Sequence, residues 1–279
     1  MVLNKLPSYT FFFCLMLYGT ACAANMDKLT SFDKTSYHLF HSKLIKHDYH
    51  VYVKTPLITE QNKDKVFPTV YLLDGGITFP LLTGYTRYLN LAEEIPDVVL
   101  VGISYGTEDW KKGNRRSTDF TAPAKQREHY GGAENFQKML SSELFPMIEK
   151  NYPSDKDKRI LFGQSMGGQF AIYNAMFHPE NFWGIIASNP AIHRNLVFFT
   201  NTYKTTTKQV KLYISRARND DVRFIKPLEK WLSYWNKHKH PWSIKTQWLN
   251  NHNHFSAAPD AFRNGIKWLL NPKEVKTVQ

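Results

Sequence analysis

The stretch RILFGQSMGG, residues 159–168, places one serine between glycines directly after an apolar run. Ile160, Leu161 and Phe162 have the character of a buried strand, and the residues from Phe170 onward have the character of a helix. A G-x-S-x-G sequence between a strand and a helix is typical of a turn in which the serine is held in a strained conformation. The stretch therefore raises the question of what could make Ser165 a nucleophile.

Short apolar runs alternate with helical patterns along most of the chain. Continuous Val, Ile and Leu runs bounded by Gly or Asp indicate parallel strands that are covered on both faces. The alternation predicts an α/β fold, a mostly parallel, doubly wound sheet with helices on both faces. The predicted strands read HVYVKTP, FPTVYLLDGG, DVVLVGISYG, RILFG, FWGIIASNP, VKLYIS and SIKTQWL, and the predicted helices read AENFQKMLSSELFPMIEKNY, QFAIYNAMFH, VRFIKPLEKWLSYWNK and APDAFRNGIKWLL.

The N-terminal residues 1–23 have the pattern of a secretory signal peptide. The apolar run FFFCLMLYGTACA ends in Ala21-Cys22-Ala23, the small-x-small pattern of a cleavage site. An uncleaved anchor and a lipid-modified Cys22 are the alternatives. Both cysteines of the chain, Cys14 and Cys22, fall in this leader. We expect a periplasmic or secreted protein without disulfides, a thiol nucleophile or stable membrane insertion after cleavage.

The remainder, residues 24–279, is predicted to be a single domain, because no repeat or Pro/Gly/Ser linker divides it. Residues 105–130 fit neither a strand nor a helix period and are polar, aromatic and basic. A loop of this length in a compact domain is usually functional. We expect it to cover the C-terminal ends of the strands, near the active site.

The chain of 279 residues carries a formal charge of +12, which could suit an anionic substrate, an anionic surface or nucleic acid. The lysines are spread along the chain rather than clustered. This distribution favours a basic, solubilising surface over a nucleic-acid site. We predict a small-molecule partner and no nucleic acid, and the sequence makes no prediction of the oligomeric state.

A serine hydroxyl becomes a nucleophile when a base lies within hydrogen-bond reach and an acid orients that base. In this type of fold the chain order is serine, acid, histidine. His252 and His254 lie between the last predicted strand and the last helix, where the base belongs, and we favour His254 because it adjoins the helix. A His-x-His metal site is the competing use of the pair. No suitably spaced Cys or acidic cluster supports it, so we predict neither a metal nor a cofactor.

The acid should follow the predicted strand VKLYIS, where Asp220 and Asp221 are adjacent. Either could reach the imidazole, and we favour Asp220, with Asp221 as the alternative. The other aspartate would cap the helix that starts immediately afterwards.

A tetrahedral intermediate also needs two backbone donors. We predict the N–H groups of Met166, which follows the serine, and of Gly76, in the loop after the strand that ends in LLDGG. For LLDGG, the alternative is an ordinary Asp-Gly turn.

Together these residues resemble the esterase D-like family of the α/β-hydrolase superfamily, in its enterobactin-esterase-like branch. The resemblance covers about two hundred residues, from VYLLDGGITF to FRNGIKWLL. It implies an α/β-hydrolase fold and a serine ester hydrolase, and it points to Arg116 as a substrate contact, with a structural salt bridge to Asp119 or another carboxylate as the alternative. Thr118 replaces a second Arg common in the family. The matching motifs are LLDG (72–75), R-x-x-D-F-T (116–121), G-x-S-x-G-G (163–168) and H-x-S (254–256).

The sequence thus predicts a serine esterase that hydrolyses carboxylic esters through an acyl-enzyme, with Ser165, His254 and Asp220 as the triad. The resemblance leaves open an acyltransferase on the same scaffold. A non-catalytic protein that binds an anionic ligand in a hydrolase fold is the alternative from another class.

Overall fold

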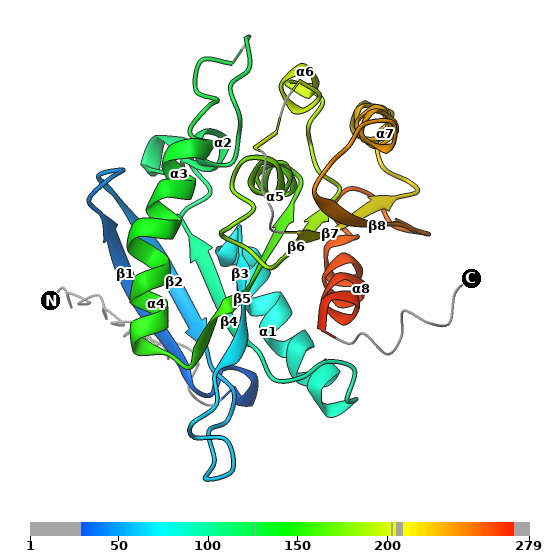
Figure 1. Ribbon diagram of the computed structural model, residues 1–279. Helices are drawn as coiled ribbons and strands as arrows, with labels where there is room; N and C mark the ends of the chain where they lie inside the picture. Colours follow the sequence, from blue (N-terminus) through cyan, green and yellow to red (C-terminus); the bar gives the residue numbers. More distant parts are fainter. Residues whose placement is uncertain (1–28, 126, 202, 205–208, 271–279) are drawn as a thin grey trace, which may run out of the picture.

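The computed structural model describes residues 29–125, 127–201, 203–204 and 209–270, so the predicted leader lies outside the described residues. Its eight strands form one sheet in the order β1-β2-β4-β3-β5-β6-β7-β8. Figure 1 shows the sheet running through the centre of the molecule with helices packed on both sides. The strands are β1 (Thr35–Ser42), β2 (His47–Lys54), β3 (Phe67–Leu72), β4 (Val99–Ser104), β5 (Ser154–Gln164), β6 (Gly184–Ser188), β7 (Val210–Ala217) and β8 (Trp242–Leu249).

The helices divide between the two faces of the sheet. Helices α1 and α8 pack with one buried cluster, and α3, α4, α5 and α7 pack with the other. Within the described ranges, no helix combines the length and hydropathy needed to cross a bilayer. The longer helices are α1 (Gly75–Leu91), α3 (Ala133–Met139), α4 (Phe145–Asn151), α5 (Met166–Phe177), α7 (Val222–Asn236) and α8 (Ala258–Leu270), and the short ones are η2 (Thr30–Phe32), η3 (Trp110–Lys112), α2 (Arg116–Asp119), η4 (Leu140–Leu144) and α6 (Leu196–Phe199).

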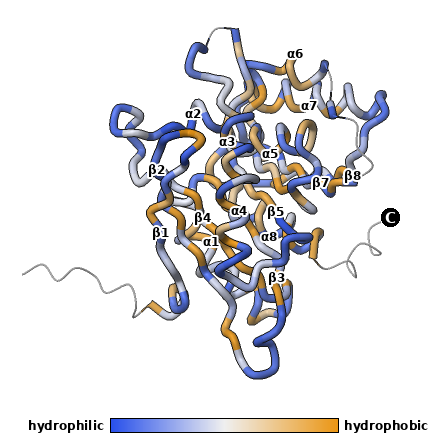
Figure 2. The backbone as a smooth tube through the Cα atoms, turned by 60° about the vertical axis from the view of Figure 1, so that its left-hand side comes forward, coloured by the Kyte–Doolittle hydropathy of each residue, from blue (hydrophilic) through white to orange (hydrophobic). Residues whose placement is uncertain are grey.

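The central strands are parallel, as predicted. Strands β4, β3, β5, β6, β7 and β8 run in one direction, while β1 and β2 form an antiparallel hairpin at the edge. Successive side chains of β3 enter opposite cores, with Val70 and Leu72 in one cluster and Tyr71 in the other. Figure 2 shows hydrophobic segments along the interior strands and hydrophilic ones in the outer loops. The predicted α/β fold with a mostly parallel sheet is confirmed.

Strand β1 was not predicted from the sequence. It lies at the sheet edge and pairs only with β2 among the described strands. Its side chains are mostly half-buried or exposed, and only Ser42 is buried. An edge strand that buries so little has no apolar run by which sequence patterning could detect it.

The helix predicted from AENFQKMLSSELFPMIEKNY is interrupted by a π-helical turn, η4. Phe145 N–H donates to the Leu140 carbonyl five residues earlier. Pro146 follows and has no N–H with which to continue the α-helical ladder. The proline therefore accounts for the break between α3 and α4.

Glu94 ties the segment after α1 to α8. Its carboxylate accepts hydrogen bonds from Arg263 Nε at 2.8 Å and Nη2 at 2.6 Å, and it lies 3.2 Å from Lys267 Nζ. These partners, Arg263 first, lower the pKa of Glu94 from 4.5 to about 2. A carboxyl whose pKa is lower in the folded state than in the unfolded state stabilises the fold at pH values above its unfolded pKa. This stabilisation is lost as the pH falls toward the pKa of the folded state.

We therefore expect Glu94→Gln to lower the free energy of unfolding by about 1 kcal/mol at pH 7. The difference should shrink at pH 3.5, where the unfolded wild-type carboxyl is largely protonated. Urea unfolding of both proteins at the two pH values measures it. An equal loss at both would show that ion pairing is not its source.

Candidate active site

Ser165 lies at the turn between β5 and α5. Its backbone has φ 60° and ψ −114°, an unusual conformation for a residue with a side chain. Three backbone hydrogen bonds hold it there. Ser165 N donates to Ser188 O at 2.9 Å, while Ser165 O accepts from Gln169 N at 2.9 Å and from Ala191 N at 3.0 Å. The strained turn is thus fixed by its neighbours on β6 and α5.

The motif glycines allow this turn to pack. A Cβ added to Gly163 would lie 2.2 Å from Gly167 O, and one added to Gly168 would lie 2.9 Å from Ser188 O. Both approaches are to backbone atoms, which cannot move aside. Gly163 and Gly168 are therefore steric requirements of the elbow, whereas a Cβ at Gly167 would make only ordinary contacts, the nearest 3.5 Å from Leu73.

Ser165, His254 and Asp220 are brought together from three separate segments. Ser165 Oγ lies 2.8 Å from His254 Nε2, and His254 Nδ1 lies 2.8 Å from Asp220 Oδ2. The side chains of His254 and Asp220 are 11% and 3% exposed. A carboxylate only accepts, so Nδ1–H donates to Asp220 and Nε2 is left to accept from the serine hydroxyl.

The neighbouring alternatives lie elsewhere. Asp221 caps α7, where its Oδ1 accepts from Arg223 N at 2.8 Å. His252 Nε2 lies 3.0 Å from Asp260 Oδ2, and its Nδ1 lies 3.3 Å from the Ser256 hydroxyl. In the part of the chain that the structure describes, no three His, Cys, Asp or Glu side chains gather as metal ligands.

Sequence reasoning missed the groups that hold His254 in place. Its carbonyl accepts from Asn189 Nδ2 at 3.1 Å and from the Gln164 side-chain amide. Phe224 stacks on the imidazole with ring centroids 4.1 Å apart and planes 21° apart. These residues lie on segments far from position 254 in the chain, so no local pattern could indicate them.

The predicted backbone donors begin two helices. Gly76 is the second residue of α1 and Met166 is the first residue of α5, at the ends of the adjacent strands β3 and β5. N–H groups in a first helical turn have no acceptor within the helix. Asp74 precedes Gly76 in a left-handed conformation with φ 55°, and its carbonyl accepts from Ile77 N at 2.9 Å and Thr78 N at 3.0 Å.

Arg116, the predicted substrate contact, forms a two-point ion pair with Asp74. Arg116 Nε lies 2.5 Å from Asp74 Oδ1 and Nη2 lies 2.8 Å from Oδ2, while Nη2 also donates to the Gln164 carbonyl at 3.3 Å. The Asp74 carboxylate raises the pKa of Arg116 against the opposing effect of burial. Arg116 thus links the loop before Gly76 to the residue before Ser165.

The segment predicted as a long loop, residues 105–130, is anchored by a buried carboxylate. Asp119 is 1% exposed and accepts from Tyr49 Oη at 2.8 Å, Tyr105 Oη at 3.2 Å and Arg115 Nε at 3.3 Å. Burial raises the pKa of Asp119, while Arg115 and the two tyrosines oppose the rise. The segment contains η3 and α2 instead of being irregular throughout, because these bonds order it.

Cations gather beside His254. His193 meets Phe224 edge to face with centroids 5.0 Å apart, and Arg223 lies 4.7 Å from the centre of the Phe224 ring. Burial lowers the pKa of His193, and the charges of Arg194, Arg223, His254 and Arg127 lower it further. Positive charges grouped in this way attract anions to the surroundings of His254.

A family model described as "Putative esterase" matches residues 42–263. "Ferri-bacillibactin esterase BesA" of Bacillus subtilis (strain 168) is 31% identical over 178 residues, which is 58% of this chain and 61% of the relative. "Apo-salmochelin esterase" of Escherichia coli O6:H1 (strain CFT073) is 27% identical over 138 residues, which is 46% of this chain and 42% of the relative. The chain thus spans less than two thirds of either relative.

A solved structure agrees on the fold. "Siderophore hydrolase EstB" from Aspergillus nidulans superposes with a TM-score of 0.73 at 17% identity, over 88% of this chain and 97% of that one. The resemblance predicted from the sequence motifs is confirmed by a family match that covers most of the chain. The chain belongs to the family described as "Putative esterase".

Proposed function

We propose that the protein is a serine esterase that hydrolyses carboxylic esters, with Ser165 as nucleophile, His254 as general base and acid, and Asp220 as the orienting carboxylate. One observation carries the proposal. The serine hydroxyl lies 2.8 Å from an imidazole whose other nitrogen lies 2.8 Å from a buried carboxylate. This is the connectivity that turns an alcohol into a nucleophile.

In the proposed reaction Ser165 Oγ attacks the ester carbonyl carbon and its proton passes to His254 Nε2. The N–H groups of Gly76 and Met166 donate to the tetrahedral oxyanion. The intermediate collapses as the bond to the alkoxy oxygen breaks and His254 protonates the leaving alcohol. Water then attacks the acyl-enzyme with the same base, releasing the acid and restoring Ser165. Asp220 stays ionised throughout and holds Nδ1–H.

We propose that Arg116 acts through Asp74 and not by direct contact with the substrate. The Nε–Nη2 edge of the guanidinium is occupied by Asp74, and Nη2 also donates to the Gln164 carbonyl. The ion pair between Arg116 and Asp74 would hold Asp74 in its left-handed conformation. It would thereby orient the Gly76 N–H toward the oxyanion. Arg116 would then be a positioning residue of the oxyanion site.

For the substrate we propose a small-molecule ester of the siderophore class, with negative charge. The two curated relatives are named as esterases of ferri-bacillibactin and apo-salmochelin, and the structural neighbour is named a siderophore hydrolase. The cations around His193 support an anionic substrate in this chain, because Phe224 contacts both His193 and the His254 imidazole.

A first test compares 4-nitrophenyl acetate with its anionic analogue 4-nitrophenyl hemisuccinate. Arg194→Gln should lower kcat/KM for the anionic ester about three- to tenfold and leave the neutral ester unchanged, since one screened charge is removed. The effect should diminish in 0.5 M salt. Lys230→Gln, on the exposed side of α7, is the matched charge control. Equal losses on both esters would contradict the role of charge.

We also propose that residues 24–279 form a single domain that is exported after cleavage of residues 1–23. The support is the apolar leader and its small-x-small end. N-terminal sequencing of the protein from the periplasmic or culture fraction should begin at Ala24. Recovery only inside the cell with Met1 retained would contradict export.

A further inference from the structure

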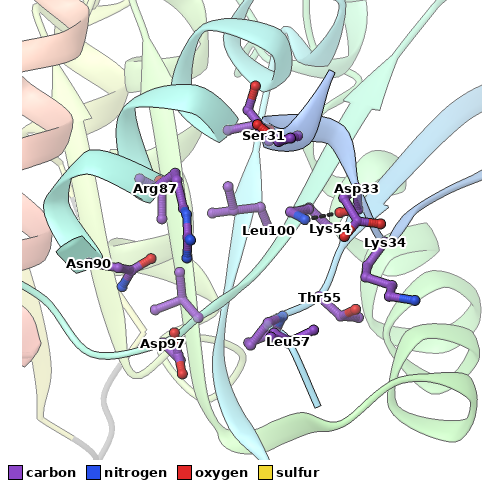
Figure 3. Close-up of a pocket in the computed structure, with 15 residues that line it drawn as sticks. Ser31, Asp33, Lys34, Lys54, Thr55, Leu57, Arg87, Asn90, Asp97 and Leu100 are labelled. Carbon is purple, nitrogen blue, oxygen red and sulfur yellow. Dashed lines mark hydrogen bonds between the residues drawn. The ribbon is translucent and has the colours of Figure 1, made fainter. Parts of the chain in front are cut away.

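A pocket of about 220 Å³ opens at the opposite end of the sheet from Ser165. Figure 3 shows the side chains that line it. Lys54 at the end of β2 and Leu100 at the start of β4 line it, and these two residues pair across the strands. Ser104, at the other end of β4, adjoins Gly76 of the candidate active site. Ser104 is four residues along β4 from Leu100, a rise of roughly 13 Å, so the pocket is distinct from the centre at Ser165.

Three basic side chains line this pocket, of which Lys54 is half-buried and Lys34 and Arg87 are exposed. Lys54 and Arg87 approach it from opposite sides, from β2 and α1, while Lys34 reaches outward at the rim (Figure 3). Among the residues that the structure describes, none of the three forms an ion pair with a carboxylate. Lys54 donates to the Asp33 backbone carbonyl. The ammonium is thus fixed in the pocket without a bonded counter-charge.

The positive charges in the pocket repel one another. Burial lowers the pKa of Lys54, and the charges of Arg87 and Lys34 lower it further, while Asp33 opposes them. Two carboxylates, Asp33 and Asp97, also line the pocket, and both are exposed. A bound anion would relieve the repulsion among the three cations.

Two buried hydroxyl groups in the pocket wall have no hydrogen-bond partner among the described residues. Thr83 and Thr86 of α1 are 2% and 6% exposed, and neither hydroxyl has a hydrogen-bond partner within the described part of the chain. Buried hydroxyls are normally satisfied. The side chains of Leu57 and Leu100 supply apolar wall beside them. Cations, free hydroxyls and an apolar wall together suit a small organic anion.

We propose that this pocket is a second binding site, which takes a small organic carboxylate with its carboxylate between Lys54 and Arg87 and its apolar body against Leu57 and Leu100. The volume is many times the roughly 10–15 Å³ that a single water requires, enough for a ring-sized ligand. The site needs no catalytic group, and it stands independently of the proposed esterase activity.

Benzoate is the probe, with phosphate as the comparison anion. Titration of the ¹⁵N-labelled Ser165→Ala protein at constant ionic strength should give saturable shifts in the amides of Thr83, Thr86 and Arg87. Phosphate should bind at least about tenfold more weakly, because it gains nothing from the apolar wall. No saturable shift at tens of millimolar benzoate, or phosphate binding as tightly as benzoate, would overturn the proposal.

Variants of residues that line the pocket test whether benzoate binds there. Arg87→Gln should weaken benzoate binding about tenfold, as expected for the loss of one charge-assisted hydrogen bond. Lys230→Gln removes the same charge from α7 and should leave binding unchanged. Thr86→Val, which keeps the side-chain shape, should weaken it by a smaller factor. Equal effects of Arg87→Gln and Lys230→Gln would overturn the assignment.

Discussion

Replacing Ser165 by alanine is expected to lower kcat for 4-nitrophenyl acetate by about 10⁶-fold, while the thermal unfolding temperature changes by no more than a few degrees. The hydroxyl is the atom that would form the acyl bond, and residual turnover would come from the oxyanion donors alone. A fluorophosphonate probe should add one label to the wild type at Ser165 and none to the variant. Turnover by Ser165→Ala close to that of the wild type would end the esterase assignment.

Adjacent residues supply matched controls for the other two members of the triad. His254→Ala should cost nearly as much as Ser165→Ala, and Asp220→Asn about 10⁴-fold, because the imidazole would lose its orientation. His252→Ala and Asp221→Asn remove the same groups two residues and one residue away, where the partners are Asp260 and the start of α7. Activity losses by these controls that match the triad variants would contradict the proposed roles.

The sequence predicted the parts of the site that are set by local geometry. Gly163 lies near the end of β5 and Ser165 directly follows that strand. The motif itself therefore contains the glycine that the turn needs in order to pack. The parallel strands were detectable because they are buried on both faces and must be continuously apolar. The sequence distinguished less well between Asp220 and Asp221 as the orienting acid, since both can reach the same loop. In the structure Asp221 caps α7, which leaves Asp220 to bond the imidazole.

The rest depends on contacts between distant segments. Phe224 on α7 stacks on His254, and Asn189 after β6 bonds the His254 carbonyl. Neither residue belongs to a motif that indicates this contact. The partner of Arg116 was equally hidden, because Asp74 is 42 residues away and Asp119, only three residues away, is a plausible alternative in sequence. In the structure Asp119 forms an ion pair with Arg115, and Arg116 forms its ion pair with Asp74.

The ion pair between Asp74 and Arg116 leads to the second large prediction. Arg116→Met would leave a half-buried carboxylate without its partner and release the left-handed turn before Gly76. We expect kcat to fall about 10²- to 10³-fold, the loss produced by removing one oxyanion donor, with KM changing less than threefold. A direct substrate contact would raise KM instead, most of all for the anionic ester, so kinetics on both esters distinguish the two roles.

A double-mutant cycle shows whether Arg116 acts through Asp74. Asp74→Asn alone should lower kcat, and the double variant should be little worse than either single variant, since both break one interaction. Arg116→Lys restores the charge but not the two-point geometry and should recover activity in part. Lys112→Met, in the same segment, controls for loss of charge. Additive losses in the cycle would mean that each side chain acts alone, and Arg116 would return to the role of a substrate contact.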